Sequence, residues 1–201
     1  ANRTFLFFGD STMQQSAHSV MNLVHANNGG CNQFLAFART HNENFQDLYE
    51  KVSEFKPSFV MFNYGAHAHS SEDMNIIFRN ILHTLKSKDY KDLLERFNMT
   101  KSIKYLWRTS HPNHGDCTAY NKPGPYQIFN STHDYYYPNG QFMKKDEMIR
   151  SFAESHGHTI VDMTPLYYRP DAHPYYHEWS ERTGRMETLS DCLHYCMPGP
   201  M

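Results

Sequence analysis

Two segments at opposite ends of the chain carry side chains that together could attack an ester. Ser11 follows Gly9 and Asp10 directly after an apolar run. Near the other end, Asp191 precedes His194 by three residues, a spacing that lets a carboxylate hold an imidazole on one turn. In a serine triad the carboxylate fixes the tautomer of the histidine, and the histidine takes the proton of the serine hydroxyl. The three residue types therefore predict nucleophilic chemistry at Ser11.

Each of these features also has a simpler structural explanation when it is taken alone. A serine at the start of a helix is commonly a capping residue, and Asp-x-x-His arises by chance in a chain with 14 histidines. Asn63, which precedes Tyr64 and Gly65, is a turn residue after a buried strand or a donor to a developing oxyanion. The order of the three features along the chain favours the catalytic interpretation.

The residues around these segments indicate a parallel sheet covered by helices. Short apolar runs alternate with stretches of helical spacing, a pattern typical of strand-helix-strand units. The predicted strands span residues 4–8, 33–38, 58–63, 102–107 and 159–163, and the predicted helices span 12–25, 43–55, 71–85, 90–97 and 139–156. Ser71 is the expected cap of the third helix, and Gly157 the left-handed residue that ends the last. A long loop over 109–138 and an irregular stretch over 164–190 complete the prediction.

Such an arrangement brings the candidate residues to one edge of the sheet. Ligands of open α/β sheets collect at the carboxyl ends of the strands. Ser11, Asn63 and Arg108 each follow or end a predicted strand, so we expect the site at that edge. The expected fold class is a three-layer α/β/α sandwich with a five-stranded, parallel, flavodoxin-like sheet, in a single domain over residues 1–201.

Composition argues against two classes of partner. Lys plus Arg number 19 and Asp plus Glu 21, so the near balance gives no field to attract nucleic acid. No apolar run approaches the roughly 18 to 20 residues that span a bilayer, so we expect no membrane insertion of this segment. Aromatic side chains make up 15% of the chain, and its many tyrosines in polar company can stack on sugars or pack beneath long loops.

Cysteine usage points to an oxidising compartment. The cysteines are Cys31, Cys117, Cys192 and Cys196. Their even number, without the Cys-x-x-Cys spacing of zinc sites, predicts two disulfides rather than four buried thiols, with three connectivities open. Asn2, Asn98 and Asn130 begin glycosylation triplets that fit the same compartment. We therefore predict the secretory pathway, in the Golgi lumen or outside the cell.

Histidine pairs suggest a metal site as an alternative. His67 with His69, and His111 with His114, have spacings that invite zinc, but no third ligand stands out, so we expect no metal. The residues expected to line or cover the cleft are His173, His177 and Trp179.

Taken together, the segments resemble the SGNH or GDSL hydrolase superfamily. The closer resemblance is to its PC-esterase branch, which includes plant trichome-birefringence-like proteins, fungal capsule O-acetylation proteins and the neurexophilin-and-PC-esterase group. It rests on FFGDSTMQQ, MFNYGAHAH, YLWRTSHPNHGDC and DCLHYCMPGP, and it covers essentially the whole chain. The Asp-Cys-x-His-x-Cys-x-Pro-Gly element of that branch matches residues 191–199 position by position. The α/β-hydrolase elbow, Gly-x-Ser-x-Gly, does not match, because residue 13 is Met13.

The resemblance implies acyl-ester chemistry on carbohydrate without a cofactor. Its catalytic residues would be Ser11, Asp191 and His194, with an acetyl-serine intermediate formed at Ser11. The oxyanion donors would be the backbone N–H of Ser11, the side chain of Asn63 and, by position, Gly30. The residues expected to contact substrate are Asp10, Gly65, His67 and Arg108.

The implied activity is the removal or transfer of O-acetyl groups of a polysaccharide or glycan. Its partners would be an acetylated carbohydrate, or a sugar acceptor together with an acyl donor. Two other functions stay open: a catalytically silent, secreted glycan-binding or interaction module, and a lipid or small-ester hydrolase on the same fold.

Overall fold

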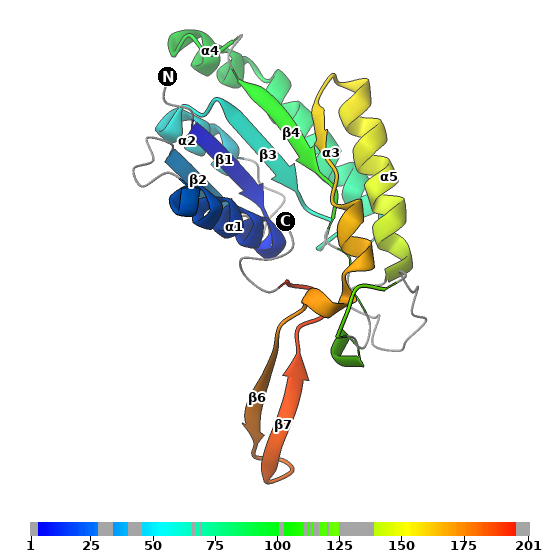
Figure 1. Ribbon diagram of the computed structural model, residues 1–201. Helices are drawn as coiled ribbons and strands as arrows, with labels where there is room; N and C mark the ends of the chain where they lie inside the picture. The colour runs from blue at the N-terminus through cyan, green and yellow to red at the C-terminus, as the bar shows by residue number, and fades with distance from the viewer. Residues whose placement is uncertain are drawn as a thin grey trace.

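A five-stranded parallel sheet forms the centre of the fold. The computed structural model describes residues 4–27, 34–39, 46–65, 67–68, 70–100, 103–110, 112, 114, 117–119, 121–124 and 139–195. The strands are β1 (Thr4–Gly9), β2 (Phe34–Arg39), β3 (Phe59–Asn63), β4 (Lys104–Arg108) and β5 (Thr159–Val161). They pair in the order β2-β1-β3-β4-β5, and every pair is parallel (Figure 1). The predicted α/β fold class is confirmed.

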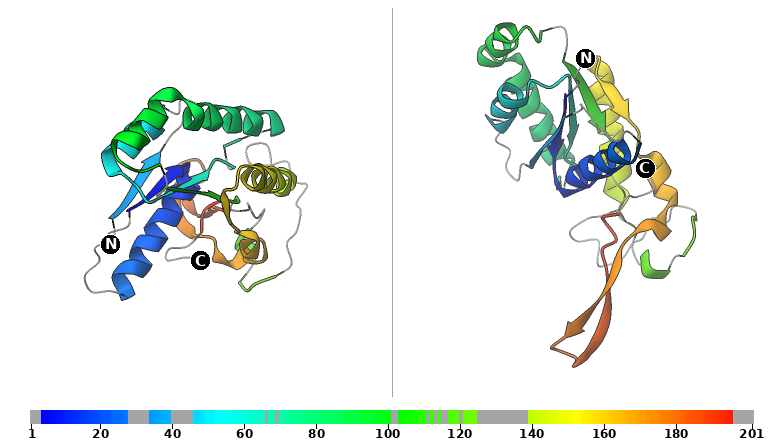
Figure 2. Two further views of the ribbon diagram at one scale, coloured as in Figure 1. Left: turned by 90° about the horizontal axis from the view of Figure 1, so that it is seen from above. Right: turned by 60° about the vertical axis from the view of Figure 1, so that its left-hand side comes forward.

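Helices cover both faces of this sheet, because the side chains of each strand alternate between the two. The helices are α1 (Ser11–Asn27), α2 (Gln46–Phe55), α3 (Ser71–Lys86), α4 (Lys88–Arg96) and α5 (Asn139–Ser155). Leu6 and Phe8 of β1 point into the large core beneath α2, α3 and α5, whereas Phe7 packs with Met13 and Ala17 of α1. Seen from above, α1 lies on one side of the sheet, and α3 and α4 on the other (Figure 2).

Aromatic rings fill the larger of the two cores. Trp107 of β4 is fully buried, and its ring lies 5.1 Å from that of Phe62 and 5.0 Å from that of Phe152, between centroids. Phe78 of α3 stacks on Phe152 of α5 at 4.3 Å. Such rings bury large apolar areas, so this core anchors β3 and β4, whose ends carry site residues.

Most predicted boundaries agree with the structure to within a few residues, and the helix cap differs by one. Ser70, rather than Ser71, caps α3: its Oγ accepts from the backbone N–H of Asp73, and Asp73 Oδ2 accepts from the backbone N–H of Ser70. This reciprocal capping box decides between two adjacent serines. Gly157, predicted as a left-handed residue after α5, has φ of 66°.

The prediction of an irregular stretch over 164–190 is wrong. The chain there forms two short 3-10 helices, η3 (Thr164–Tyr168) and η4 (Pro170–Ala172), and the hairpin strands β6 (Tyr175–Ser180) and β7 (Arg185–Ser190). The hairpin projects away from the sheet (Figure 1). Trp179 and Met186 face each other across it and are 59% and 57% exposed. The described side chains of its strands, over 177–180 and 185–187, are exposed or partly buried. The sequence of these strands accordingly lacks the apolar alternation that identifies half-buried strands.

Two further predictions concern loops and membranes. Much of the predicted long loop, including residues 125–138, lies outside the described residues. In the part of the chain that the structure describes, no helix combines the length and the apolar character needed to span a membrane.

Candidate active site

Ser11 lies where β1 ends and α1 begins. A Cβ on Gly9 would come within 2.3 Å of the carbonyl oxygen of Asn63 on β3, so the close approach of the two strands requires glycine. Asp10 then caps the helix, because its Oδ1 accepts from the backbone N–H of Thr12 at 3.0 Å and of Met13 at 3.3 Å. Among the described residues, the N–H of Ser11 has no acceptor, which leaves a donor at the positive end of the helix.

The structure brings Ser11, His194 and Asp191 into one hydrogen-bonded chain. His194 Nε2 lies 2.9 Å from Ser11 Oγ, and His194 Nδ1 lies 2.7 Å from Asp191 Oδ2. A carboxylate only accepts, so the proton of a neutral His194 is assigned to Nδ1. Nε2 then presents its lone pair to the serine hydroxyl, which is the arrangement that a general base requires.

Asp191 is held in its ionised form. Burial acts to raise its pKa, but the hydrogen bonds and charge of His194 and the N–H of Leu193 outweigh burial and lower the pKa to about 2. The other oxygen, Oδ1, accepts from the backbone N–H groups of Leu193 and His194, each at 3.1 Å. The same carboxylate therefore orients both the ring and the backbone of His194.

A buried polar cluster lies beside the start of α1. Arg108, at the end of β4, donates from Nη2 to Thr12 Oγ1 at 2.7 Å, and that hydroxyl donates to Asp10 Oδ1 at 2.6 Å. Burial lowers the pKa of Arg108 to about 10, against the opposing charges of Asp10 and Asp146, so Arg108 remains a cation at neutral pH. Asn63 is fully buried, and its Nδ2 donates to the carbonyl of Arg108 at 2.8 Å.

The residues expected to contact substrate differ in their exposure. Asp10 and Arg108 are 2% and 1% exposed, so they brace the site from inside and offer almost no surface to a substrate. Gly65 is buried as well, and a Cβ there would lie 1.7 Å from Ser110 Oγ. His67 is exposed. Gly30, the expected third oxyanion donor, lies outside the described residues.

Lys145 of α5 supports the segment that follows β3. Its ammonium group is buried and donates to the carbonyls of Gly65 at 2.6 Å and Ala68 at 2.9 Å. Burial lowers the pKa of Lys145 to about 8, although nearby carboxylates, led by that of Asp146, raise it. Two carbonyls without a donor would be costly in this interior, so Lys145 fixes the path of the chain after Asn63.

One disulfide ties the loop of Asp191 and His194 to the rest of the fold. Cys192 is bonded to Cys117 of the short 3-10 helix η1 (Cys117–Ala119), with a Cα–Cα distance of 5.5 Å. The carbonyl of Cys192 also accepts from the backbone N–H of His114 at 3.0 Å. The remaining two cysteines, Cys31 and Cys196, lie outside the described residues.

Two residues that bond to the backbone near His194 were not predicted in that role: Gln15 was not singled out, and His173 was expected at the cleft. His173, expected to line or cover the cleft, is only 5% exposed and lies against the backbone of His194. His177 and Trp179, given the same expectation, lie on the exposed hairpin. Gln15 binds the backbone of Tyr195, a contact that no motif announces. Its only sequence signal is its position one helical turn after Ser11.

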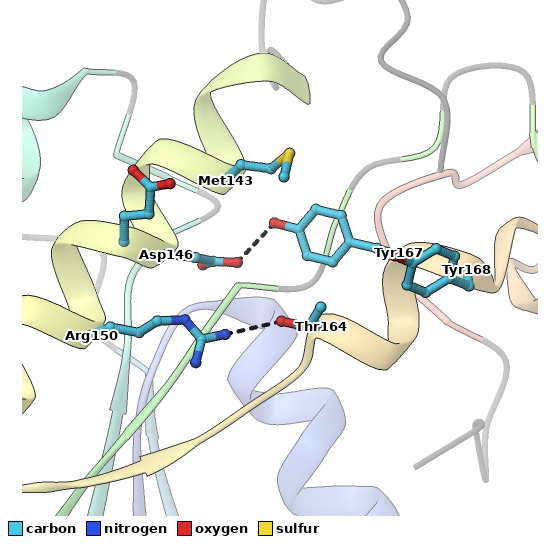
Figure 3. Close-up of a pocket in the computed structure, with 7 residues that line it drawn as sticks. Met143, Asp146, Arg150, Thr164, Tyr167 and Tyr168 are labelled. Carbon is cyan, nitrogen blue, oxygen red and sulfur yellow. Dashed lines mark hydrogen bonds between the residues drawn. The ribbon is translucent and has the colours of Figure 1, made fainter. Parts of the chain in front are cut away.

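A cavity of about 210 Å³ opens between α5 and η3 (Figure 3). It is lined by Met143, Asp146, Glu147, Arg150, Thr164, Tyr167 and Tyr168. Asp146 accepts from the hydroxyl of Tyr167 at 2.8 Å and from the N–H of Ser110 at 2.7 Å, and burial raises its pKa to about 6. Arg150 donates to Thr164 Oγ1 at 2.9 Å. None of the predicted site residues lines this cavity, and several of its polar groups bond to one another.

Comparisons with known proteins show which proteins the chain is similar to. Residues 57–201 match the model of PC-Esterase, a GDSL/SGNH-like acyl-esterase family found in Pmr5 and Cas1p. Xyloglucan O-acetyltransferase 4 from Populus trichocarpa is 29% identical over 133 residues, which are 62% of this chain and 28% of that protein. The chain thus spans 28% of the length of that relative.

Two solved structures are among those similar to the chain. The periplasmic domain of a lipopolysaccharide acetyltransferase from Salmonella ser. Paratyphi A has a TM-score of 0.50 and 11% identity, over 81% of this chain and 66% of that one. A GDSL-like lipase from Bacteroides thetaiotaomicron VPI-5482 has a TM-score of 0.49 and 12% identity, over 98% of this chain and 82% of that one. At 11% identity the likeness to the Salmonella domain concerns the fold alone.

Proposed function

The chain belongs to the PC-esterase family of GDSL/SGNH-like acyl-esterases, and from this premise we propose that it removes or transfers O-acetyl groups of a polysaccharide or glycan. The observation that carries the proposal is the hydrogen-bonded chain from Asp191 through His194 to Ser11. The acetyltransferase names of the poplar relative and of the Salmonella domain point to the same substrate class.

The first half-reaction follows from the positions of these three groups. His194 Nε2 takes the proton of Ser11 Oγ, which lies 2.9 Å away, and the serine oxygen attacks the ester carbonyl. Asp191 stabilises the imidazolium that forms. The backbone N–H of Ser11 and, as expected from the sequence, Gly30 would donate to the oxyanion. Asn63, which is fully buried and donates to the carbonyl of Arg108, would brace the site from inside. His194 then protonates the leaving alcohol, and the acetyl group remains on Ser11.

The second half-reaction uses the same base on a different acceptor. His194 removes a proton from water or from a sugar hydroxyl, and that oxygen attacks the acetyl carbon. The bond from this carbon to Ser11 Oγ then breaks, and His194 returns the proton to Oγ. Attack by water releases acetate, and attack by the sugar hydroxyl forms the new ester. The choice depends on how well the bound acceptor excludes water from Ser11. An oxidising compartment, such as the Golgi lumen or the outside of the cell, is supported by the Cys117–Cys192 disulfide.

A rapid acid quench tests the acetyl-serine directly. Protein mixed with p-nitrophenyl acetate and quenched should gain the mass of one acetyl group on the peptide that contains Ser11. His194→Ala should lose this adduct and its turnover while it keeps its circular dichroism spectrum. If wild-type protein that is demonstrably folded turns over the ester without an acetylated Ser11, the proposed mechanism is wrong. Adding xyloglucan oligosaccharides then measures transfer against hydrolysis.

A further inference from the structure

The peptide bond between His194 and Tyr195 is bonded at both of its polar atoms. The carbonyl of His194 accepts from Nδ1 of His173 at 2.6 Å, and the N–H of Tyr195 donates to Oε1 of Gln15 at 2.9 Å. Gln15 also donates from Nε2 to the carbonyl of Tyr195. Two side chains from distant parts of the sequence therefore hold the backbone immediately after His194.

Gln15 links this backbone to the nucleophile through one helix. It follows Ser11 by four positions on α1, and residues four apart lie on the same face of a helix. Ser11 meets the ring of His194 while Gln15, one turn later, meets the backbone of the next residue. The helix that carries the serine hydroxyl thus also sets the position of the loop that carries the base.

His173 holds the other side of the peptide bond in a defined tautomer. A carbonyl only accepts, so Nδ1 of His173 must carry a proton. Burial, with the charge of His114, lowers the pKa of His173 to about 4, although Asp191 and the carbonyl of His194 raise it, so the ring is neutral at pH 7. The other ring nitrogen of His173, Nε2, lies 2.7 Å from Nδ1 of His114. The neutral ring of His173 therefore donates from Nδ1 to the carbonyl of His194.

We propose that Gln15 and His173 are positioning residues, which clamp the backbone at His194 so that its ring reaches the hydroxyl of Ser11. The inference rests on the proposed use of Ser11 and His194 in ester chemistry. The clamp completes the bonding of His194, whose ring and N–H are already held by Asp191 and whose Nε2 meets Ser11. A displacement of this backbone by about 1 Å would misplace the base, a fault that commonly costs about 100-fold in rate.

Gln14 provides a matched control for Gln15. The two are neighbours of one type on one helix, both partly buried, but within the described part of the chain the Gln14 side chain makes no hydrogen bond. Gln15→Met should lower kcat for p-nitrophenyl acetate by about 10- to 100-fold with KM nearly unchanged. Gln14→Met should keep both values. Equal kcat for the two variants, at equal Tm, would overturn the role of Gln15.

His173 is tested by rescue at a single atom. The amide nitrogen of asparagine can occupy the place of Nδ1, so His173→Asn keeps a donor for the carbonyl of His194, whereas His173→Leu removes it. We expect His173→Asn to retain about tenfold more kcat than His173→Leu. Equal losses, or no loss in His173→Leu, would overturn the role of His173.

A measurement without turnover separates this inference from the proposed function. In a Ser11→Ala background, amide exchange at Tyr195 reports the hydrogen bond to Gln15 by nuclear magnetic resonance. The exchange should be about tenfold faster with Gln15→Met than with Gln14→Met. Equal rates would contradict the clamp whatever the enzyme does. Faster exchange in Gln15→Met, together with a folded wild type that forms no acetyl-serine, would instead support the clamp and reject the proposed chemistry.

Discussion

Ser11 and His194 are 183 positions apart in the sequence, yet Ser11 Oγ and His194 Nε2 lie 2.9 Å apart. The fold achieves this by placing Ser11 at the start of α1, directly after β1, and by holding the segment around His194 at several points. Cys192 bonds to Cys117, and Gln15 binds Tyr195. The distance between serine and histidine is therefore a property of the whole fold, and substitutions outside the three reacting side chains can change it.

The carboxylate of Asp191 should matter for the tautomer of His194 more than for folding. In Asp191→Asn an amide that can donate would face Nδ1, which favours the wrong tautomer. We expect kcat for p-nitrophenyl acetate to fall by about 10³- to 10⁴-fold. Asp162→Asn, which changes an exposed aspartate paired with Arg150, is the control and should leave kcat unchanged. A loss smaller than tenfold in Asp191→Asn would show that Asp191 does not orient the base.

Gly65 should not tolerate a side chain. A Cβ there would lie 1.7 Å from Ser110 Oγ and 2.9 Å from Ser110 Cβ, so Gly65→Ala should lower the free energy of unfolding by about 1–3 kcal/mol. Nothing lies within 4 Å of a Cβ on Gly124, so Gly124→Ala should change it by less than about 0.5 kcal/mol. Urea unfolding measures both. Adding Ser110→Ala should relieve part of the cost of Gly65→Ala, and strictly additive effects would contradict the predicted contact.

Sequence patterns identified the sheet and the order of the site segments because both are local signals. The run TFLFF and its counterparts mark buried strands, and the Asp-x-x-His spacing lies within four residues. No local pattern in the sequence indicates that Asp10 and Arg108 are buried, because a charged residue is expected to be exposed unless its partners are known. Their partners, Thr12 among them, become visible only when β1 and β4 lie in one sheet.

Two other features could not be predicted from the sequence, because neighbouring residues of the same type were equally good candidates for the same role. Ser70 and Ser71 are equal candidates for a cap, and only the return bond from Asp73 selects Ser70. Gln14 and Gln15 are likewise equivalent in the sequence, and the choice depends on which one faces Tyr195. The hairpin was missed for a different reason: the described side chains of its strands, over 177–180 and 185–187, are exposed or partly buried and show no apolar period.

Acid should destabilise the protein through His173. Its pKa is lowered to about 4 by burial and by His114, whereas an unfolded histidine titrates near 6.5; Asp191 and the carbonyl of His194 oppose the shift. Between these values the unfolded chain binds more protons, so the free energy of unfolding should fall as the pH drops from 6.5 to 4. Burial lowers the pKa of His114 in the same direction, against its bond to the Tyr167 carbonyl and the charge of Asp171.

The slope of the free energy of unfolding against pH isolates the contribution of His173. His173→Asn removes the titrating ring, so its free energy of unfolding should change less steeply with pH between 6.5 and 4 than that of the wild type. Urea titrations at several pH values measure the two slopes. If His173→Asn retains the wild-type slope, burial of His173 is not the source of the acid sensitivity.

The disulfide should support both stability and turnover. It joins residues 75 positions apart, and disulfides that close such loops contribute about 2–4 kcal/mol. Replacing both Cys117 and Cys192 by alanine should therefore lower the free energy of unfolding by this amount. Because Cys192 lies between Asp191 and Leu193, kcat should fall as well, under conditions in which the variant is still folded. Unchanged unfolding and kcat would contradict the pairing.

The most direct test of the central claim is the intact mass of the protein after treatment with a fluorophosphonate. The wild type should gain one adduct, because His194 activates the hydroxyl of Ser11. Ser11→Ala should gain none, and Ser155→Ala, at an exposed serine of α5, should react like the wild type. A folded wild type without an adduct, or an adduct that persists in Ser11→Ala, would contradict the account of Ser11 as the nucleophile.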